Sequence, residues 1–233
     1  MSKLPNIEIL HEDNHLIVVN KRSGDIVQGD KTGDKPLNEI VKDYIKVKHN
    51  KPGEVYLGTP HRLDRPTSGI VVFTKTSKAL SRLNKMFHDK EVQKTYWAIV
   101  KDKPLKTNDR LIHYLKKNNV KNRSNAYSKE TEGTKRAELT YELIHSFTNY
   151  HLLEINPLTG RHHQIRVQLN AIGSTIKGDL KYGYSRSNPD ASISLHARSI
   201  EFIHPVSKEP LKITCCPISK DVLWKEACKL FKH

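Results

Sequence analysis

Residues 61–70 read HRLDRPTSGI and contain the first group that could do chemistry. Asp64 lies between Arg62 and Arg65, and positive charges this close favour the ionised form of a carboxyl group. We therefore expect Asp64 to be an anion at neutral pH and to act as a nucleophile or a base. A plainer alternative is that Asp64 anchors a loop through Arg62 or caps a turn, because aspartate is common at turns.

Residues 159–173 read TGRHHQIRVQLNAIG and contain a second candidate group. Ile165 and Leu169 fall on one stripe of a helix, and Gly173 suits the left-handed position after a helix end. This spacing places Arg166 beside the buried stripe, where a guanidinium is costly unless it meets a carboxylate or a phosphate. The alternative is an arginine whose stem covers apolar surface while its head reaches water.

Strands and helices on either side must position these two stretches. Apolar or alternating runs predict short strands at residues 7–10, 16–20, 55–57, 70–73, 94–100, 137–144, 150–155, 193–197, 200–203 and 211–214. Helical spacing predicts helices at residues 37–48, after a cap at Thr76 or Ser77, within 159–173, and after a cap at Ser219 with a packing face of Val222, Leu223, Ala227, Leu230 and Phe231. In the strand at 94–100, alternation places Tyr96 on the face opposite Trp97.

The charge of the chain points to a polyanionic partner. Its 233 residues carry 40 Lys and Arg against 25 Asp and Glu, a net charge of +15, and nucleic acid is the first partner to consider. The alternative is a basic protein that binds no nucleic acid. Residues 101–136 are especially basic and show little periodicity, so we expect a phosphate-contacting surface or a mobile basic loop there.

Several classes of protein are not expected. The sequence contains no apolar run of about 18 residues and no apolar signal-peptide core at its start, so we expect a cytoplasmic protein that does not contact the membrane. The spacing of Cys215, Cys216 and Cys228 matches neither a disulfide framework nor a zinc site. We therefore expect three reduced cysteines and no metal.

The stretch at residues 61–70 resembles the signature of the RluA family of pseudouridine synthases, in which the aspartate is essential. Further resemblances follow in the family's order at residues 94–96, 159–161 with 163–166, 178–179 with 182–183, and 195–197 with 202–205. Together they cover about residues 7–217.

This resemblance implies an α+β fold, with a largely antiparallel, curved mixed sheet flanked by helices around a central basic cleft. It implies a single catalytic domain over residues 1–233, with two subdomains about one cleft as an alternative. The implied reaction breaks the bond between the base and the ribose of a uridine in tRNA or ribosomal RNA, turns the base, and rejoins it through carbon 5. No cofactor is implied, and we expect a monomer.

The resemblance also implies three catalytic roles. Asp64 would be the catalytic carboxylate, attacking the sugar or the base, or removing a sugar proton. Arg166 would form the ion pair that keeps Asp64 charged and oriented. Tyr96 would stack on the target base and take part in proton transfer at carbon 5.

Five more residues are implied to bind the substrate. Arg62 would help to hold the target nucleotide out of its helix, since a stacked base cannot be reached. Ile165 would form part of the apolar wall beside the base. The remaining three, which belong to the third motif, are Arg161, His163 and Gln164.

The chain departs from the family pattern in places. His162 stands where Thr or Ser is more usual, and Gln168 where His is common, which puts details of the substrate in doubt. Many relatives carry an RNA-binding module before the catalytic pattern, which here begins at about Ile7, so we expect the catalytic domain itself to supply the affinity for RNA. Two other hypotheses are a non-catalytic RNA-binding or ribosome-assembly protein on the same fold, and a DNA-binding protein.

Overall fold

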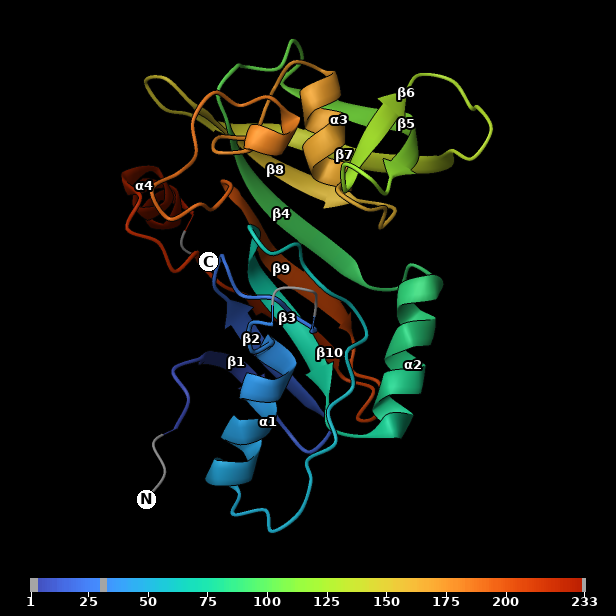
Figure 1. Cartoon of the computed structure of the whole chain (residues 1–233), viewed down its shortest axis with the longest axis vertical. Helices are drawn as coiled ribbons and strands as arrows, with labels where there is room; N and C mark the ends of the chain where they lie inside the picture. The colour runs from blue at the N-terminus through green and yellow to red at the C-terminus, as the bar shows by residue number, and fades with distance from the viewer. Residues whose placement is uncertain (1–3, 30–32, 232–233) are drawn as a thin grey trace. The chain divides into compact units, whose positions relative to one another are not determined.

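The computed structural model describes residues 4–29 and 33–231, which form two compact units (Figure 1). The first unit consists of the described residues up to 93 together with residues 198–220. The second consists of residues 94–197 together with residues 221–231. The chain enters the second unit at the start of β4 (Gln93–Val100) and returns to the first unit within β9 (Leu195–Ile203).

The first unit is built on antiparallel strands. Strand β2 (Leu16–Lys21) pairs on one side with β1 (Glu8–Glu12) and on the other with β3 (Ser68–Thr74). Strand β10 (Pro210–Thr214) pairs with the part of β9 from Ser199 to Ile203. The unit also contains the helices α1 (Leu37–Lys48) and α2 (Ser77–His88).

Two buried strands form the centre of this unit. Every residue of β2 is buried, as are residues 69–74 of β3. Leu16 and Val18 of β2 share an apolar cluster with Leu83 of α2. Helix α2 begins at the predicted cap, because the Thr76 hydroxyl accepts a hydrogen bond from the N–H of Ala79 (3.2 Å).

The strands of the second unit lie in the order β4, β8 (His151–Pro157), β7 (Lys135–Ser146), β5 (Asn108–Asn118) and β6 (Arg123–Tyr127), each antiparallel to its neighbour. The helical elements are α3 (Gln164–Ala171), the short 3-10 helix η1 (Leu180–Tyr182) and α4 (Val222–Leu230).

Alternation along β4 sorts the second unit into layers. Ala98 lies in the apolar cluster that contains Ile165 of α3, and Tyr96 packs against the same cluster. Trp97 lies in a different cluster with Trp224 of α4. Helices α3 and α4 therefore cover opposite faces of the sheet, as predicted for Tyr96 and Trp97.

The predicted α+β fold is confirmed, with a large, mostly antiparallel sheet and, in the described residues, four α-helices. The central basic cleft stays a prediction. Residues 55–57 form no strand, and next to them only Gly58 pairs, in a bridge to Thr74. The two strands predicted at 193–197 and 200–203 are the single strand β9.

The basic segment at 101–136 is not a structureless loop, because it contains β5, β6 and the start of β7. Its strands were hidden in the sequence because Leu111 and Leu115 are the only buried residues of β5. The last helix is capped by Asp221 and not by Ser219. Its predicted packing face is partly wrong, since Trp224 is buried while Val222 is 72% exposed.

The prediction of three reduced cysteines is wrong in part. Cys216 and Cys228 are each in a disulfide and therefore not reduced. Sequence spacing did not reveal this, because disulfide formation depends on the distance between Cα atoms in the fold. Cys215 lies buried, and burial raises the pKa of its thiol to about 12.

Candidate active site

Asp64 lies half-buried in the loop that leads into β3. Its backbone carbonyl accepts a hydrogen bond from the N–H of Thr67 (3.0 Å), which closes a tight turn over Arg65 and Pro66. Proline fixes one backbone dihedral in that turn, and Thr67 is itself buried. The turn therefore gives the backbone of Asp64 a defined place directly before Ser68, the first residue of β3.

A buried lysine that the sequence analysis missed fastens this loop. Lys21 ends β2 and is fully buried, and its ammonium group donates to the carbonyls of Arg22 (2.8 Å) and Arg65 (3.1 Å). Burial lowers the pKa of Lys21 to about 8, although the negative charges of Asp25 and Asp64 oppose this shift. A signal was available in the sequence, since Lys21 ends a strand whose first four residues are apolar on both faces, which is typical of a strand buried on both sides.

The two arginines beside Asp64 lie in different settings. The exposed guanidinium of Arg65 donates to the carboxylate of Asp34 (2.6 Å), so it takes part in a surface ion pair. Arg62 is exposed, which suits a side chain that reaches a substrate. Its role in holding a flipped nucleotide stays a prediction.

Arg166 is held inside the second unit by a bidentate ion pair with Asp179. Its Nε donates to Oδ2 (2.7 Å) and its Nη2 to Oδ1 (2.8 Å), and the two residues are 4% and 1% exposed. The centre of the Tyr182 ring lies 5.2 Å from the guanidinium carbon, within range for a cation–π contact. Arg166 is therefore a buried arginine with a carboxylate partner and not one whose head reaches water, and its predicted pairing with Asp64 stays a prediction.

The loop that carries Asp179 requires glycine at position 178. The φ angle of Gly178 is +85°, in the left-handed region, and a Cβ there would lie 2.7 Å from both the Asn188 side-chain nitrogen and the Ser192 carbonyl. The sequence pointed to Gly178 and Asp179 only as a matching motif. It did not reveal that the carboxylate of Asp179 binds Arg166.

His163 is packed into a hydrogen-bonded aromatic group at the start of α3. It is the N-cap residue with φ 54°, and its ring stacks on His162 with centroids 3.8 Å apart. Its Nδ1 lies 2.9 Å from the hydroxyl of Tyr182, which also accepts the N–H of Ser124 (2.8 Å). Burial, together with the charge of Arg166, lowers the pKa of His163 to about 2, so the ring is neutral at physiological pH.

Gln164 braces the loop before α3. Its side-chain oxygen accepts from the hydroxyl of Thr159 (2.7 Å) and the N–H of Arg161 (3.0 Å), and its amide donates to the carbonyl of Glu138 (3.0 Å). These contacts position the loop, and substrate binding by Arg161, His163 and Gln164 stays a prediction. Ile165 is 7% exposed and lies in the cluster against which Tyr96 packs.

Each unit thus holds part of the predicted site. Arg62 and Asp64 belong to the first unit, and the other six predicted residues belong to the second: Tyr96, Arg161, His163, Gln164, Ile165 and Arg166. Within residues 4–29 and 33–231 no group of three or more His, Cys, Asp or Glu is arranged to hold a metal ion. No helix in that part of the chain is long and apolar enough to cross a membrane.

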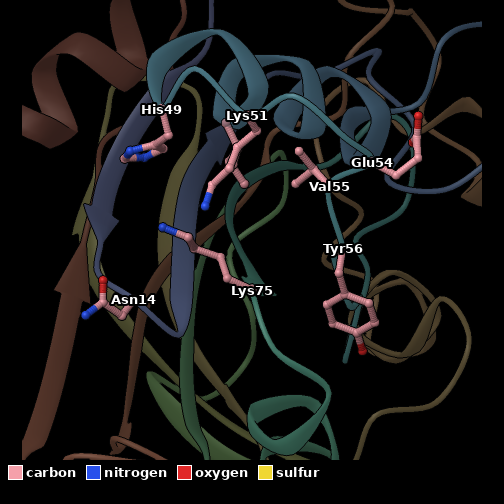
Figure 2. Close-up of a pocket in the computed structure, with 8 residues that line it drawn as sticks. Asn14, His49, Lys51, Glu54, Val55, Tyr56 and Lys75 are labelled. Atoms are coloured by element: carbon pink, nitrogen blue, oxygen red, sulfur yellow. The ribbon is translucent and has the colours of Figure 1, made fainter.

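A pocket of about 310 Å³ in the first unit is lined by none of the predicted site residues (Figure 2). Its walls are formed by Asn14, Ile45, His49, Lys51, Glu54, Val55, Tyr56 and Lys75. The ammonium group of Lys75 donates to Glu12 (3.1 Å) and to the carbonyl of Asp13 (2.7 Å), so its charge is already paired. We do not include this pocket in the candidate site.

Comparison with known proteins identifies relatives over most of the chain. Residues 15–171 match the protein family described as RNA pseudouridylate synthase. The ribosomal large subunit pseudouridine synthase C of Vibrio cholerae is 32% identical over 221 residues, which cover 91% of this chain and 67% of that protein. The tRNA pseudouridine synthase C of the same species is 30% identical over 225 residues, covering 89% of each protein.

The chain is shorter than many of these relatives. It spans 64% of the ribosomal large subunit pseudouridine synthase C of Vibrio vulnificus and 60% of the tRNA pseudouridine synthase C of Pectobacterium carotovorum. Among solved structures, human RNA pseudouridylate synthase domain containing 4 has a TM-score of 0.76 at 22% identity, covering 95% of this chain and 92% of that one. This likeness shows that the fold is shared.

Proposed function

Because the chain belongs to the RNA pseudouridylate synthase family, we propose that it converts uridine to pseudouridine in RNA. In this isomerisation the bond between N1 of the base and C1′ of the ribose breaks, and a bond between C5 and C1′ forms. The proton on C5 is released and N1 gains one, so product and substrate have the same composition. The observation that carries the proposal is that the family match includes Asp64, Tyr96 and Arg166 in order.

In this proposal Asp64 is the catalytic carboxylate and acts on the target uridine through its sugar or its base. The turn that ends at Thr67 and the bonds from Lys21 to the carbonyls beside it support a fixed position for Asp64. A fixed charge costs little reorganisation when the reaction begins.

Arg166 keeps Asp64 ionised and oriented. Asp179 accepts hydrogen bonds from Nε and Nη2 of Arg166, and the proposal pairs the same guanidinium with Asp64. The bidentate partner supports this role, because it restricts the guanidinium to one plane.

Tyr96 and Ile165 contact the target base in this proposal. Tyr96 stacks on the base and assists proton transfer at carbon 5, and Ile165 supplies apolar wall. Their packing against one cluster supports this arrangement. Arg62, which is exposed, keeps the nucleotide out of its helix.

We propose tRNA or ribosomal RNA as the substrate. Of the two Vibrio cholerae relatives, one is named as a ribosomal large subunit pseudouridine synthase and the other as a tRNA pseudouridine synthase. The net charge of +15 supports binding to a structured polyanion of this kind.

The test measures tritium released from RNA labelled at carbon 5 of uridine. Wild-type protein should release tritium from a tRNA or ribosomal RNA transcript, and Asp64→Asn should release none while it binds the same RNA with a similar Kd. Asp43→Asn is the matched control, since Asp43 lies on α1 in a surface pair with Lys35 and should not affect turnover. Turnover by Asp64→Asn would contradict the assignment of Asp64, and RNA binding without turnover by wild type would favour a non-catalytic RNA-binding protein.

A further inference from the structure

Two arginines in the basic segment of the second unit share one buried carboxylate. Glu138 lies on β7, and its side chain is 5% exposed. Its Oε1 pairs with Arg110 of β5, through both Nε and Nη2, and its Oε2 pairs with Nη1 of Arg136. The two arginine side chains are themselves 62% and 47% exposed.

The strand register explains why the three side chains meet. Thr140 lies opposite Arg110, Glu138 lies opposite Ile112, and Arg136 lies opposite Tyr114. Positions two apart on a strand point to the same face. Arg110, Glu138 and Arg136 therefore share one face, with the carboxylate between the two guanidinium groups.

The backbone around Glu138 is unusually well fixed. Its N–H donates to the hydroxyl of Thr159 (2.8 Å), and its carbonyl accepts from the N–H of Leu158 (2.9 Å) and the amide of Gln164 (3.0 Å). The carboxylate is therefore anchored to the loop before α3. The arginines that it holds gain a defined position from that anchor.

A third arginine lies at the same place. The Nε of Arg161 donates to the backbone carbonyl of Arg136 (3.1 Å). Arg110, Arg136 and Arg161 together carry three positive charges against the single negative charge of Glu138, which leaves a local net charge of +2. Each of these three side chains is exposed.

We propose that Arg110, Arg136 and Arg161, ordered by Glu138, form a binding site for a backbone phosphate of the RNA substrate. This inference rests on the proposed function and adds Arg110, Arg136 and Glu138, which lie outside the predicted site, to Arg161, which belongs to it. A guanidinium whose position is fixed loses little conformational freedom when it binds a phosphate with two parallel hydrogen bonds. Glu138 uses Nε and Nη2 of Arg110 and Nη1 of Arg136, which directs the remaining N–H groups of both side chains away from the carboxylate.

The ordering role assigned to Glu138 can be distinguished from an effect of net charge on RNA binding. If only net charge mattered, removing the negative charge of Glu138 would strengthen binding to RNA. If the carboxylate orders the arginines, its removal weakens binding although the protein becomes more positive. Glu138→Gln therefore gives opposite results for the two explanations.

The experiment measures the Kd of a labelled tRNA transcript over a range of salt concentrations. Arg110→Gln should raise Kd about tenfold at low salt and reduce the slope of log Kd against log salt by about 1, the effect of one lost phosphate contact. Glu138→Gln should raise Kd by a similar factor. Lys106→Gln is the matched control, because it removes one charge from the same basic segment, where Lys106 is 68% exposed and pairs with Asp109.

Equal Kd values and slopes for Arg110→Gln and Lys106→Gln would overturn the proposal, as would tighter binding by a folded Glu138→Gln variant. Should Glu138→Gln fail to fold, Arg110→Gln and Arg136→Gln still decide it. A third outcome is that polyglutamate binds the wild-type protein but not Arg110→Gln, while both proteins bind RNA with the same Kd. This outcome would indicate an acidic protein partner and overturn the phosphate site.

Tritium release separates this inference from the proposed function. If the wild type releases tritium and the arginine variants bind RNA with the wild-type Kd, the phosphate site is refuted and the proposed function is not. Absence of wild-type turnover refutes the proposed function, and the affinity measurements still report on the site. For an active enzyme, the single-turnover rate of the control variant Lys106→Gln at saturating RNA should match that of the wild type.

Discussion

Replacing Asp179 by Asn tests whether the buried partner of Arg166 matters for stability and for rate. Asp179 is 1% exposed and Arg166 is 4% exposed, so the substitution removes a charged carboxylate that pairs with a buried guanidinium. Removing one partner of a buried ion pair costs about 3–5 kcal/mol. Because the Asn side-chain oxygen still accepts one of the two hydrogen bonds, we expect about 3 kcal/mol.

The expected effect on rate has a separate origin. Asn presents an N–H₂ group where Oδ1 or Oδ2 accepted a hydrogen bond, so the guanidinium must shift away from it. A displacement of about 1 Å in a catalytic group can cost about 10²-fold in rate. Since Asp179 is buried, it cannot contact RNA directly, and we expect the single-turnover rate to fall about 10²-fold with Kd for RNA unchanged within about twofold.

Urea unfolding and single-turnover tritium release measure the two effects. Asp109→Asn is the control, because Asp109 pairs with the exposed Lys106 at the surface and its loss should leave the urea midpoint nearly unchanged. The double variant Arg166→Met with Asp179→Leu should recover at least about 1 kcal/mol relative to Asp179→Asn, since removing both charges is less costly than leaving one. It should nevertheless remain inactive. A loss below about 1 kcal/mol in Asp179→Asn, together with a rate near that of the wild type, would refute this reasoning.

Two further predictions concern stability. Burial opposes ionisation of Glu12, but hydrogen bonds from Lys48, His49 and Lys75 lower its pKa from 4.5 to about 2. A lowered carboxyl pKa stabilises the fold above pH 4.5, and this stabilisation is lost as the pH falls through 2. Glu12→Gln should therefore cost about 1–2 kcal/mol in urea unfolding at pH 7, with the difference from wild type disappearing near pH 2. In thermal unfolding, Gly178→Ala should destabilise the protein by at least about 1 kcal/mol more than Gly173→Ala. Both glycines have a positive φ angle, but only position 178 lacks room for a Cβ atom. Equal losses of stability in the two variants would rule out the steric argument.

The sequence predicted elements well where apolar residues were dense. The alternation of Tyr96 and Trp97 in β4 was readable because both faces of that strand are covered, one by α3 and the other by α4. Strand β5 was not readable, since its exposed basic side chains obscure two buried leucines. Residues 55–57 have the composition of a strand but form none, because strand formation requires a pairing partner that sequence cannot supply.

The sequence identified candidate site residues, but it did not identify the charged side chains with which they pair. Arg166 was expected beside a carboxylate, yet the identity of Asp179 depended on a loop whose path is set by Gly178. Glu138 was not recognised at all, because one of its two arginine partners, Arg110, comes from another strand. Partners far apart in sequence become neighbours only through strand register and loop geometry.

The source of positive charge near Asp64 is also different from the one that the sequence suggested. Arg65 is paired with Asp34, so much of its charge is already compensated at the surface. Lys21 is fully buried, and the negative charge of Asp64 helps to keep its ammonium group protonated. A buried cation is screened less than an exposed one, so Lys21 contributes more to the positive field at this loop than Arg65, whose charge is paired at the surface.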